Sequence, residues 1–346
     1  MNVTKYEIDI LAVGAADACL IRFYDENDNS YVVLIDAGNY SDGEMVHKFI
    51  RERYNTFTID LAICTHCDKD HFGGVVYLLE NMKEHPGTSV DIKELWINDP
   101  GKHVNVEDVK RYRNQDNVEK EARSVYTLPN GKNLFDVLQK VNDKVTVKEA
   151  FSDSVFEKFE NHIEILGPTK AFYEELAFSF RNKLEPVEDT INESAEEELF
   201  SSAGQVTSKT LDESNDDPSS HNQSSILTVF RTDDDGGNTF FFPGDAGRVA
   251  FSRMYDCDKD KIKDVTFLKV PHHGSRGNMN SDMINWINPK VGVVSTESYG
   301  HYLDALVVKV FKKKGAYLVS THQSGNIWYH VGTPNKSDYG PISKPL

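Results

Sequence analysis

The chain of 346 residues has few cysteines and no long apolar run. Its cysteines do not show the spacing of a disulfide framework; they are Cys19, Cys64, Cys67 and Cys257. No run of 18 apolar residues is present, so we expect no transmembrane helix. The first residues lack the basic and apolar regions of a signal peptide. We therefore expect a cytoplasmic protein without a membrane partner.

Basic residues are also scarce, with 38 Lys and Arg against 55 Asp and Glu, a formal net charge of −17. Residues 185–217 contain eleven acids and one lysine, which gives 1 − 11 = −10 and leaves −7 for the rest of the chain. An acidic surface repels phosphate backbones at long range, which disfavours broad, sequence-independent nucleic-acid binding. Metal ions and a few local bases can still hold a phosphate. We interpret 185–220 as an acidic surface insertion with the composition of a disordered segment.

Hydrophobic periodicity predicts strands and helices along both halves of the chain. Strands are expected at 5–13, 17–24, 31–35, 61–64, 162–166, 225–231, 238–242, 265–270, 291–295, 315–320 and 326–331. Helices are expected at 43–52, 75–81, 106–127, 133–142, 169–183, 247–256, 280–287 and 302–314. We predict one domain over 1–346, with a partly helical insertion or cap at 96–220.

Four metal-competent side chains lie within six residues, after the predicted strand 61–64 and before two glycines and a predicted helix. They are His66, Asp68, Asp70 and His71. Imidazole and carboxylate ligands suit zinc, manganese or iron. Their close spacing in an irregular loop allows them to converge, whereas a regular helix would not bring all four to one point. A solvated acidic loop with incidental histidines is the alternative, and the position after a buried strand favours the metal site.

Two later strands also end at potential ligands. Asp245 follows the predicted strand 238–242 at a Gly-flanked turn, and a carboxylate there can bridge two metals through its two oxygens. His272 and His273 follow the predicted strand 265–270. Adjacent side chains of an extended segment point in opposite directions, so we expect one histidine to bind metal and the other to contact substrate. Taken alone, each feature is also compatible with an ordinary surface turn.

Single histidines near the C-terminus are further candidates. His301 lies between a predicted strand and a predicted helix, where it could act as a general acid or contact a phosphate. His322, near the end of a later predicted strand, is a rival. A hydrogen-bonded structural role is an equal alternative for each of them.

These motifs together resemble the metallo-β-lactamase-like domain of the bacterial competence protein ComEC and its stand-alone relatives. In one variant of the family, aspartate replaces the second histidine of the motif His-x-His-x-Asp-His, and Asp68 stands at that position here. After residues 299–301, Tyr302 stands where the family has a proline. The matching elements follow the family order at residues 11–18, 34–38, 66–71, 243–246, 269–275 and 299–301. The resemblance implies an α+β fold, the αβ/βα four-layer metallo-β-lactamase sandwich, with one or two metals at the sheet edges. Region 96–220 carries no element of it.

The resemblance also implies a ligand set. It gives His66 and Asp68 to one metal, and Asp70 and His71 to the other, with Asp245 as a bridge and His272 completing the second site. Asn222 stands three residues before Ser225, where ComEC relatives have an asparagine, and His221 is adjacent to it. Aspartate at position 68 makes the first site richer in oxygen, so manganese stays open beside zinc.

The expected chemistry is hydrolysis by a metal-activated water. Asp70 would hold a metal or orient the nucleophile. Residues that could steady developing negative charge are His273, Ser275, Arg276 and His301.

Three functions follow. The first is a phosphodiesterase or nuclease acting on nucleic acid or a small phosphodiester, with which Lys269, Arg276 and the basic stretch 110–113 are compatible. The second is a hydrolase of amides, esters or peptides, which the acidic charge favours slightly. The third is a partner-regulated module in which 96–220 docks another protein, and the complete ligand set argues against it.

Overall fold

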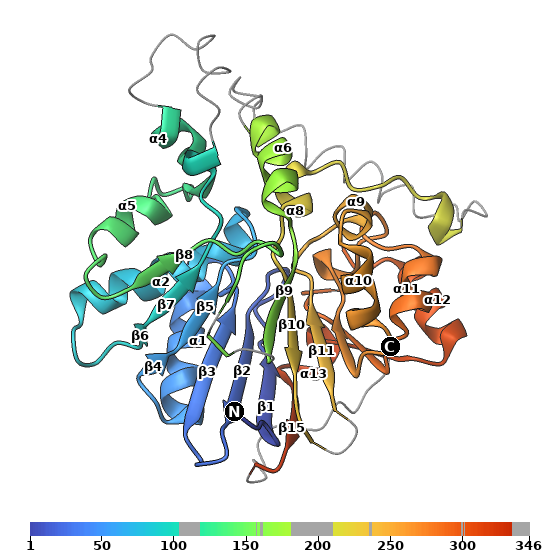
Figure 1. The fold of residues 1–346 in the computed structure, drawn as a ribbon, viewed down its shortest axis with the longest axis horizontal. Helices are drawn as coiled ribbons and strands as arrows, with labels where there is room; N and C mark the ends of the chain where they lie inside the picture. Colours follow the sequence, from blue (N-terminus) through green and yellow to red (C-terminus); the bar gives the residue numbers. More distant parts are fainter. Residues whose placement is uncertain are drawn as a thin grey trace.

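A computed structural model of the chain describes residues 1–103, 118–156, 158–159, 162–180, 210–234, 237–298, 300 and 302–333, without the side chains at 118, 178 and 257. Two mixed β-sheets pack face to face, and helices cover the outer face of each sheet (Figure 1). This arrangement is the predicted αβ/βα sandwich. The N-terminal half supplies most of one αβ unit and the C-terminal half most of the other, although the C-terminal strand pairs with the first sheet.

The first sheet has seven strands. Their order is β15 (Ile327–Val331), β1 (Lys5–Ile10), β2 (Cys19–Tyr24), β3 (Ser30–Ile35), β5 (Leu61–Ile63), β7 (Glu94–Trp96) and β8 (Thr146–Lys148). Pairing is antiparallel from β15 to β3 and parallel from β3 to β8. A separate two-stranded sheet contains β4 (Thr58–Ile59) and β6 (Asp91–Ile92).

The second sheet has six strands. Their order is β14 (Tyr317–Ser320), β13 (Val291–Val294), β12 (Phe267–Lys269), β11 (Thr239–Phe242), β10 (Leu227–Arg231) and β9 (Ile163–Gly167). The strands from β11 to β14 are parallel, and β9, β10 and β11 pair antiparallel.

The helices lie in three groups. On the first sheet are α1 (Gly43–Phe49), α2 (Lys69–Glu84) and α5 (Leu134–Gln139), and on the second are α9 (Arg248–Ser252), α10 (Asp256–Lys259), α11 (Ser281–Ile287) and α12 (Ala305–Lys314). At the upper end in Figure 1 lie α4 (Val118–Ala122), α6 (Lys170–Phe180) and α8 (Ser220–Gln223), and α13 (Thr321–Ser324) follows β14. Within these ranges, no helix is both long and apolar enough to cross a bilayer.

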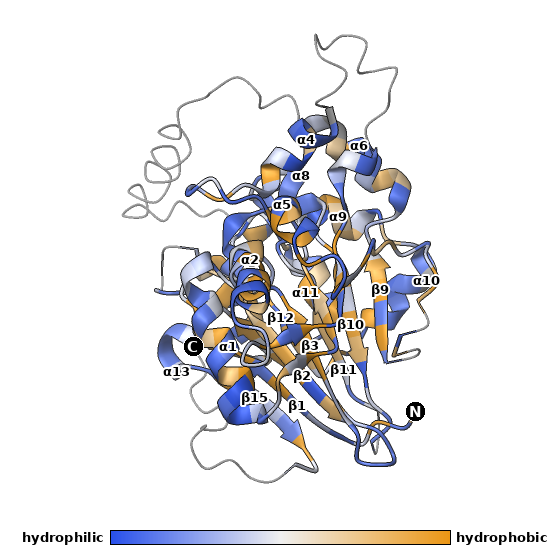
Figure 2. Cartoon of the chain, turned by 90° about the vertical axis from the view of Figure 1, so that its left-hand side faces the viewer, coloured by the Kyte–Doolittle hydropathy of each residue, from blue (hydrophilic) through white to orange (hydrophobic). Residues whose placement is uncertain are grey.

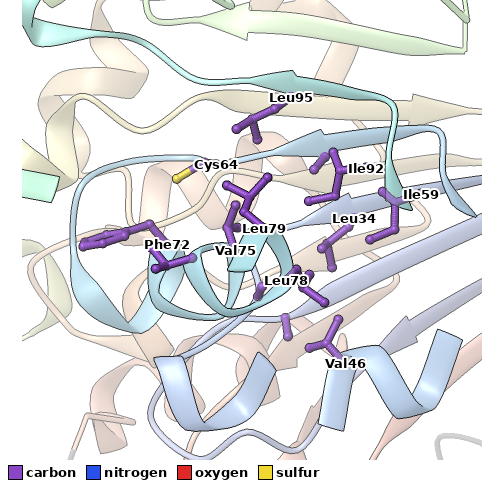
Figure 3. Packing of buried hydrophobic residues seen from close by; sticks show 14 of the residues in the cluster. Leu34, Val46, Ile59, Cys64, Phe72, Val75, Leu78, Leu79, Ile92 and Leu95 are labelled. Atoms are coloured by element: carbon purple, nitrogen blue, oxygen red, sulfur yellow. The ribbon is translucent and has the colours of Figure 1, made fainter. Parts of the chain in front are cut away.

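Successive residues of a strand face opposite sides of the sheet. The strands therefore place side chains both in the core between the two sheets and in the core beneath the outer helices. Phe240 and Phe242 of β11 enter the core between the sheets, whereas Phe241 faces the outer helices and packs edge-on against Phe251 of α9. Figure 2 shows apolar residues concentrated along the strands. On the first sheet, Leu34 of β3 faces outward toward Val75 of α2 (Figure 3).

Helix α2 begins earlier than the sequence pattern indicated. Periodicity predicted a helix from residue 75, but the helix begins at Lys69 with Asp68 at its N-cap. Asp70 and His71 therefore stand in the first helical turn, and only His66 and Asp68 precede the helix. The expectation that all four side chains lie in an irregular loop is wrong, because the apolar face that reveals a helix is absent from a first turn occupied by polar ligands.

Two glycines allow α2 to lie close to the segment that follows β3. A Cβ at Gly74 would stand 1.9 Å from the carbonyl oxygen of Ala37, and one at Gly73 would stand 2.5 Å from the backbone nitrogen of Tyr40. Hydrogen bonds join the same backbones, from Gly74 N to Gly38 O and from Ala37 N to the carbonyl oxygen of His71. The pair of glycines thus determines the distance between β3 and the ligand-bearing turn.

Region 96–220 contributes to both sheets as well as to the upper helices. β8 is the edge strand of the first sheet, and β9 is the edge strand of the second. Residues 104–117 and 181–209, which include much of the predicted helix 106–127 and of the acidic insertion, lie outside the described residues.

We expect Gly74→Ala to lower the free energy of unfolding by about 1–3 kcal/mol or more, because the added methyl group overlaps a backbone carbonyl in a packed region. Urea denaturation of the purified protein measures this change. Lys83→Ala, at an exposed position of the same helix, is the control and should change little. Equal stabilities for Gly74→Ala and wild type would contradict the close approach.

Candidate metal centre

Sheet topology brings the candidate ligands to one edge of the sandwich. The segment from His66 to His71 follows β5, Asp245 follows β11, and the two histidines at 272 and 273 follow β12. Asn222 precedes β10, which runs antiparallel to β11, so the start of β10 and the end of β11 lie at the same edge. Carboxyl ends of parallel strands are a common place for active sites in α/β folds.

Several buried ligand atoms at this edge have no hydrogen-bond partner. They are Nε2 of His66, Nε2 of His71 and Oδ1 of Asn222. Oδ2 of Asp245 lies 3.2 Å from Nε2 of His71 and 4.0 Å from Nε2 of His66. Burying a polar atom without a hydrogen-bond partner costs free energy. Ring nitrogens left unpaired around one carboxylate are therefore the arrangement expected of metal ligands. The residues present therefore fit a divalent metal.

Hydrogen bonds at Nδ1, on the side of the ring away from Asp245, orient His66 and His71. Nδ1 of His71 lies 2.7 Å from Oδ2 of Asp36, and the hydroxyl of Thr65 donates to the same oxygen at 2.7 Å. That hydroxyl then accepts from Nδ1 of His66 at 3.0 Å. Because these contacts engage both Nδ1 atoms, the Nε2 atoms are the ones that face Asp245 and are placed to bind a metal.

Four residues form a compact ligand group. Asp70, His71, Asp245 and His273 each offer one atom, and these atoms all lie within 4.8 Å of one another. Nδ1 of His273 donates to the carbonyl oxygen of Ser295 at 2.8 Å, which directs Nε2 toward Oδ2 of Asp70, 3.3 Å away. The sequence had assigned this place to His272 and a catalytic role to His273.

The backbone explains why both adjacent histidines reach the site. His272 and His273 have φ of 46° and 52°, and Gly274 has φ of 87°, so the segment is a tight left-handed turn and not an extended strand. Nε2 of His272 lies 3.9 Å from Oδ2 of Asp245. The expectation that the two rings point in opposite directions is wrong. Such backbone conformations are costly for residues other than glycine and tend to occur at functional sites.

A second group of candidate ligands lies beside the first. Oδ2 of Asp68 is 3.7 Å from Nε2 of His66, and Oδ1 of Asp68 is 3.0 Å from Nδ1 of His221. The ring of His221 packs edge-on against Phe180 of α6. Cys67 lies in the same neighbourhood, because its sulfur and ligand atoms of Asp68 and His221 are all within 4.8 Å of one another.

The pKa values of the site residues reflect this packing of opposite charges. Burial alone would raise the pKa of Asp245, but the neighbouring His71 and His272 hold it well below its usual range. Burial alone would lower the pKa of His71, but Asp245, Asp36 and Asp70 raise it well above its usual range. In the absence of a cation, these imidazoles supply the positive charge that the carboxylates require.

Lys269 does not have the role that its sequence position allowed. Its side chain is 1% exposed, and its ammonium group lies 2.7 Å from Asp17, which is itself buried. Asp17 in turn lies 3.7 Å from Nδ1 of His273. Lys269 therefore forms an internal ion pair beneath the site, and its compatibility with phosphate binding was a wrong inference.

The other predicted substrate contacts have different surroundings. Arg276 forms an ion pair of 2.6 Å with Asp304 and is about one-third exposed. Ser275 follows the turn of His272, to whose carbonyl oxygen its backbone nitrogen donates. His322 is exposed on α13. His301, with Tyr299 and the basic stretch 110–113, lies outside the described residues.

Two residues near the ligands were missed as site residues by the sequence. Asp36 belongs to a motif of the resemblance, but nothing in that motif indicated a contact with His71. Asp217 was counted among the acids of a surface segment, yet its side chain is only 9% exposed and accepts a hydrogen bond from Asn222. The one available signal was that Asp217 lies five residues before Asn222.

Comparisons with known proteins agree with this geometry. Residues 13–149 match the family model of the metallo-beta-lactamase superfamily. The two-sheet sandwich and its ligand-bearing edge agree with this match, and they are the features of a metal-dependent hydrolase.

A stretch of 123 residues, 34% of the chain, is 28% identical to ComE operon protein 3 of Bacillus subtilis (strain 168). This match covers 15% of that protein, so the chain spans a small part of its relative's length. Two solved structures show weak similarity. For a diphosphatase of the PhnP family the TM-score is 0.37, with 11% identity, over 92% of this chain and 86% of that one. For a long-form RNase Z from yeast the TM-score is 0.39, with 12% identity, over 85% and 37%.

We expect Asp36→Asn to weaken metal binding about 10–100-fold, the usual effect of removing a carboxylate that orients a ligand histidine. An asparagine can donate to Nδ1 of His71, which would favour the tautomer with the proton on Nε2. A chelator competition assay measures the affinity. Asp25→Asn, in the turn after β2, is the matched control. Wild-type affinity in Asp36→Asn would show that this carboxylate does not orient the ring.

We expect Lys269→Met to lower the free energy of unfolding by about 3–5 kcal/mol, because it leaves the buried carboxylate of Asp17 without its partner. Chemical denaturation measures this change, with the exposed Lys263→Met as control. Unchanged stability combined with loss of phosphate affinity would instead support the original phosphate-binding interpretation.

Proposed function

We propose that the chain is a two-metal hydrolase that cleaves phosphodiesters, either in nucleic acid or in a smaller compound. The observation that supports this most is the set of unpaired Nε2 atoms of His66 and His71 around a single oxygen of Asp245. A carboxylate flanked in this way can bridge two cations, each with its own remaining ligands.

The two ligand sets follow from the contacts. In this proposal one ion is held by Asp70, His71, Asp245 and His273. The other is held by His66, Asp68, Asn222, Asp245 and His272. The geometry thus favours His273 for the ligand position that the resemblance gave to His272, and it leaves His272 to the other ion.

Charge balance favours an anionic substrate. Two divalent cations carry +4 and the carboxylates of Asp68, Asp70 and Asp245 carry −3, so the loaded centre has a formal charge of +1. The ligand set that contains Asn222 includes two carboxylates and an amide oxygen, a composition that accepts manganese as well as zinc.

Different residues have different roles in the proposed reaction. When bound, the divalent ions would acidify a water molecule and polarise the scissile group. Asp36, Thr65 and Ser295 keep the ligand imidazoles in one tautomer. Ser275 and Arg276, which follow the ligand turn, are proposed to contact the substrate together with His301. Because Arg276 is also paired with Asp304, substrate must compete for its guanidinium group.

We propose that the chain is one metallo-β-lactamase-like domain in which the helices of 96–220 form a cap beside the centre. Phe180 of α6 contacts His221, and His221 hydrogen-bonds to the ligand Asp68, so the cap meets the ligand shell directly. The cap would then limit which substrates reach the ions, and it is the surface on which a protein partner would act.

Hydrolysis of an amide, ester or peptide is the second candidate. The observation in its favour is that two of the nearby cations, Lys269 and Arg276, are neutralised by Asp17 and Asp304. Few basic groups then remain among the described residues at this edge to hold a polyanion.

A substrate panel with defined metals tests the proposal. Purified protein loaded with zinc or manganese should cleave a phosphodiester, such as bis-p-nitrophenyl phosphate, or single-stranded DNA or RNA. The double variant Asp70→Ala, His71→Ala should lose its metal and fall at least about 1,000-fold in activity, since it removes two ligands of one ion.

The exposed Lys83→Ala variant, as a matched control, should keep wild-type activity. Turnover of peptides or esters with no cleavage of any phosphodiester would favour the second candidate. A double variant that retains both metal and activity would contradict the assigned centre.

A further inference from the structure

We propose that Asp217 is a positioning residue that presets Asn222 and His272 as ligands of one of the two ions. This inference rests on the proposed metal-dependent function and deepens it. Asp217 lies in the segment between η7 (Leu211–Glu213) and α8, at the C-terminal end of the acidic stretch.

The carboxylate of Asp217 is held firmly by its surroundings. Its backbone nitrogen donates to the carbonyl oxygen of Gly277, and its own carbonyl oxygen accepts from the side chain of Gln223 at 2.8 Å. Oδ1 accepts from the backbone nitrogen of Ser219, the N-cap of α8. These contacts fix the segment against both the loop after β12 and α8, so Oδ2 has one available direction.

Oδ2 of Asp217 accepts hydrogen bonds from two side-chain amides. Nδ2 of Asn222 lies 2.7 Å away and Nδ2 of Asn278 lies 2.9 Å away. Nδ1 of His272 is 3.4 Å from the same oxygen. This one oxygen is therefore the acceptor that joins the three side chains.

The acceptor oxygen of Asp217 determines which way the amide of Asn222 faces. Because Oδ2 accepts from the NH₂ group of Asn222, that group faces Asp217 and Oδ1 of Asn222 faces away. Asn222 is 3% exposed, and its Oδ1 is a buried atom without a partner. Asp217 thus holds the oxygen of Asn222 in the position of a ligand that awaits a cation.

The same carboxylate acts on His272. Nδ1 of His272 lies 3.1 Å from Oδ1 of Asn278 as well as near Asp217, so the proton on Nδ1 is directed to that side. Nε2 is then the ring nitrogen closest to Asp245, at 3.9 Å. Asn278 is fully buried and also donates to the carbonyl oxygen of Asp245, which ties this network to the bridging residue.

Among the described residues, Oδ2 of Asp217 contacts Asn222, Asn278 and His272, and it does not contact the ligand group of Asp70, His71 and His273. Its removal should therefore affect one ion and not the other. A residue with a merely structural role would lower both affinities, or would lower the stability of the metal-free protein.

Metal titration of the full-length chain tests this inference. The affinities of zinc and manganese are measured by competition with a chromophoric chelator, and the bound metal is counted after dialysis. We expect Asp217→Asn to weaken one class of site about 10–100-fold and to leave the other class within about 2-fold of wild type. Asp216→Asn is the matched control, since Asp216 is the adjacent acid, is half-exposed and pairs with Arg248. It should bind metal like wild type.

Circular dichroism of the metal-free proteins shows whether the variants fold. If Asp217→Asn does not fold, Asp217→Glu keeps the charge and moves the carboxylate by one methylene, and the same selective weakening is expected. Equal affinities of wild type and the Asp217 variant for every ion bound, or equal weakening of both classes, would overturn the positioning role while the metal-dependent function stands. A wild-type protein that binds no metal would overturn both.

Discussion

The close contact between α2 and the segment after β3 is the constraint on which the centre depends. Gly73 and Gly74 carry no side chain, so the first turn of α2 lies directly against the backbone around Ala37. At this distance Asp36 reaches Nδ1 of His71, and through Thr65 it also controls His66. A side chain at either glycine would separate the two backbones, and the orientation of both imidazoles would be lost.

Electrostatics impose a second constraint. Several carboxylates approach one another at the edge of the sandwich, and each requires a positive partner. Asp17 has the internal cation Lys269, whereas the cationic partners of Asp70 and Asp245 among the described residues are imidazoles. An ammonium group satisfies a carboxylate permanently, but an imidazole gives up its proton and binds a metal with the same nitrogen. Lys269 therefore belongs to the permanent framework, and the histidines belong to the exchangeable centre.

The edge of the sandwich is asymmetric. The ligand group of Asp70, His71, Asp245 and His273 is supported by the strand ends and by α2, which are parts of the two central layers. The group that includes Asp68 and Asn222 is supported by α8 and by Phe180 of α6, which belong to the cap side. A change in the cap would therefore affect the ion bound by Asp68 and Asn222 more directly than the other ion.

Much of the fold was predictable from the sequence, because burial alternates along strands such as β3 and β11 and leaves a clear pattern in the residues. The strand-to-loop positions of His66, Asp245 and His272 were predictable for the same reason. What the sequence could not determine was which distant polar groups meet. The pairing of Asp36 with His71, of Lys269 with Asp17 and of Asp217 with Asn278 joins segments through tertiary packing, and local pattern carries no information about such contacts.

The adjacent histidines at positions 272 and 273 show most clearly which features of the site are predictable from sequence and which depend on tertiary packing. That two imidazoles follow β12, and hence which chemistry is available at that edge, can be read from the order of the residues. That both rings face the site depends on packing, because the left-handed turn at His272 and His273 is held by Ser295, Asn278 and Asp245. A strained backbone conformation is stable only when its surroundings support it, and those surroundings come from the segments that follow three different strands.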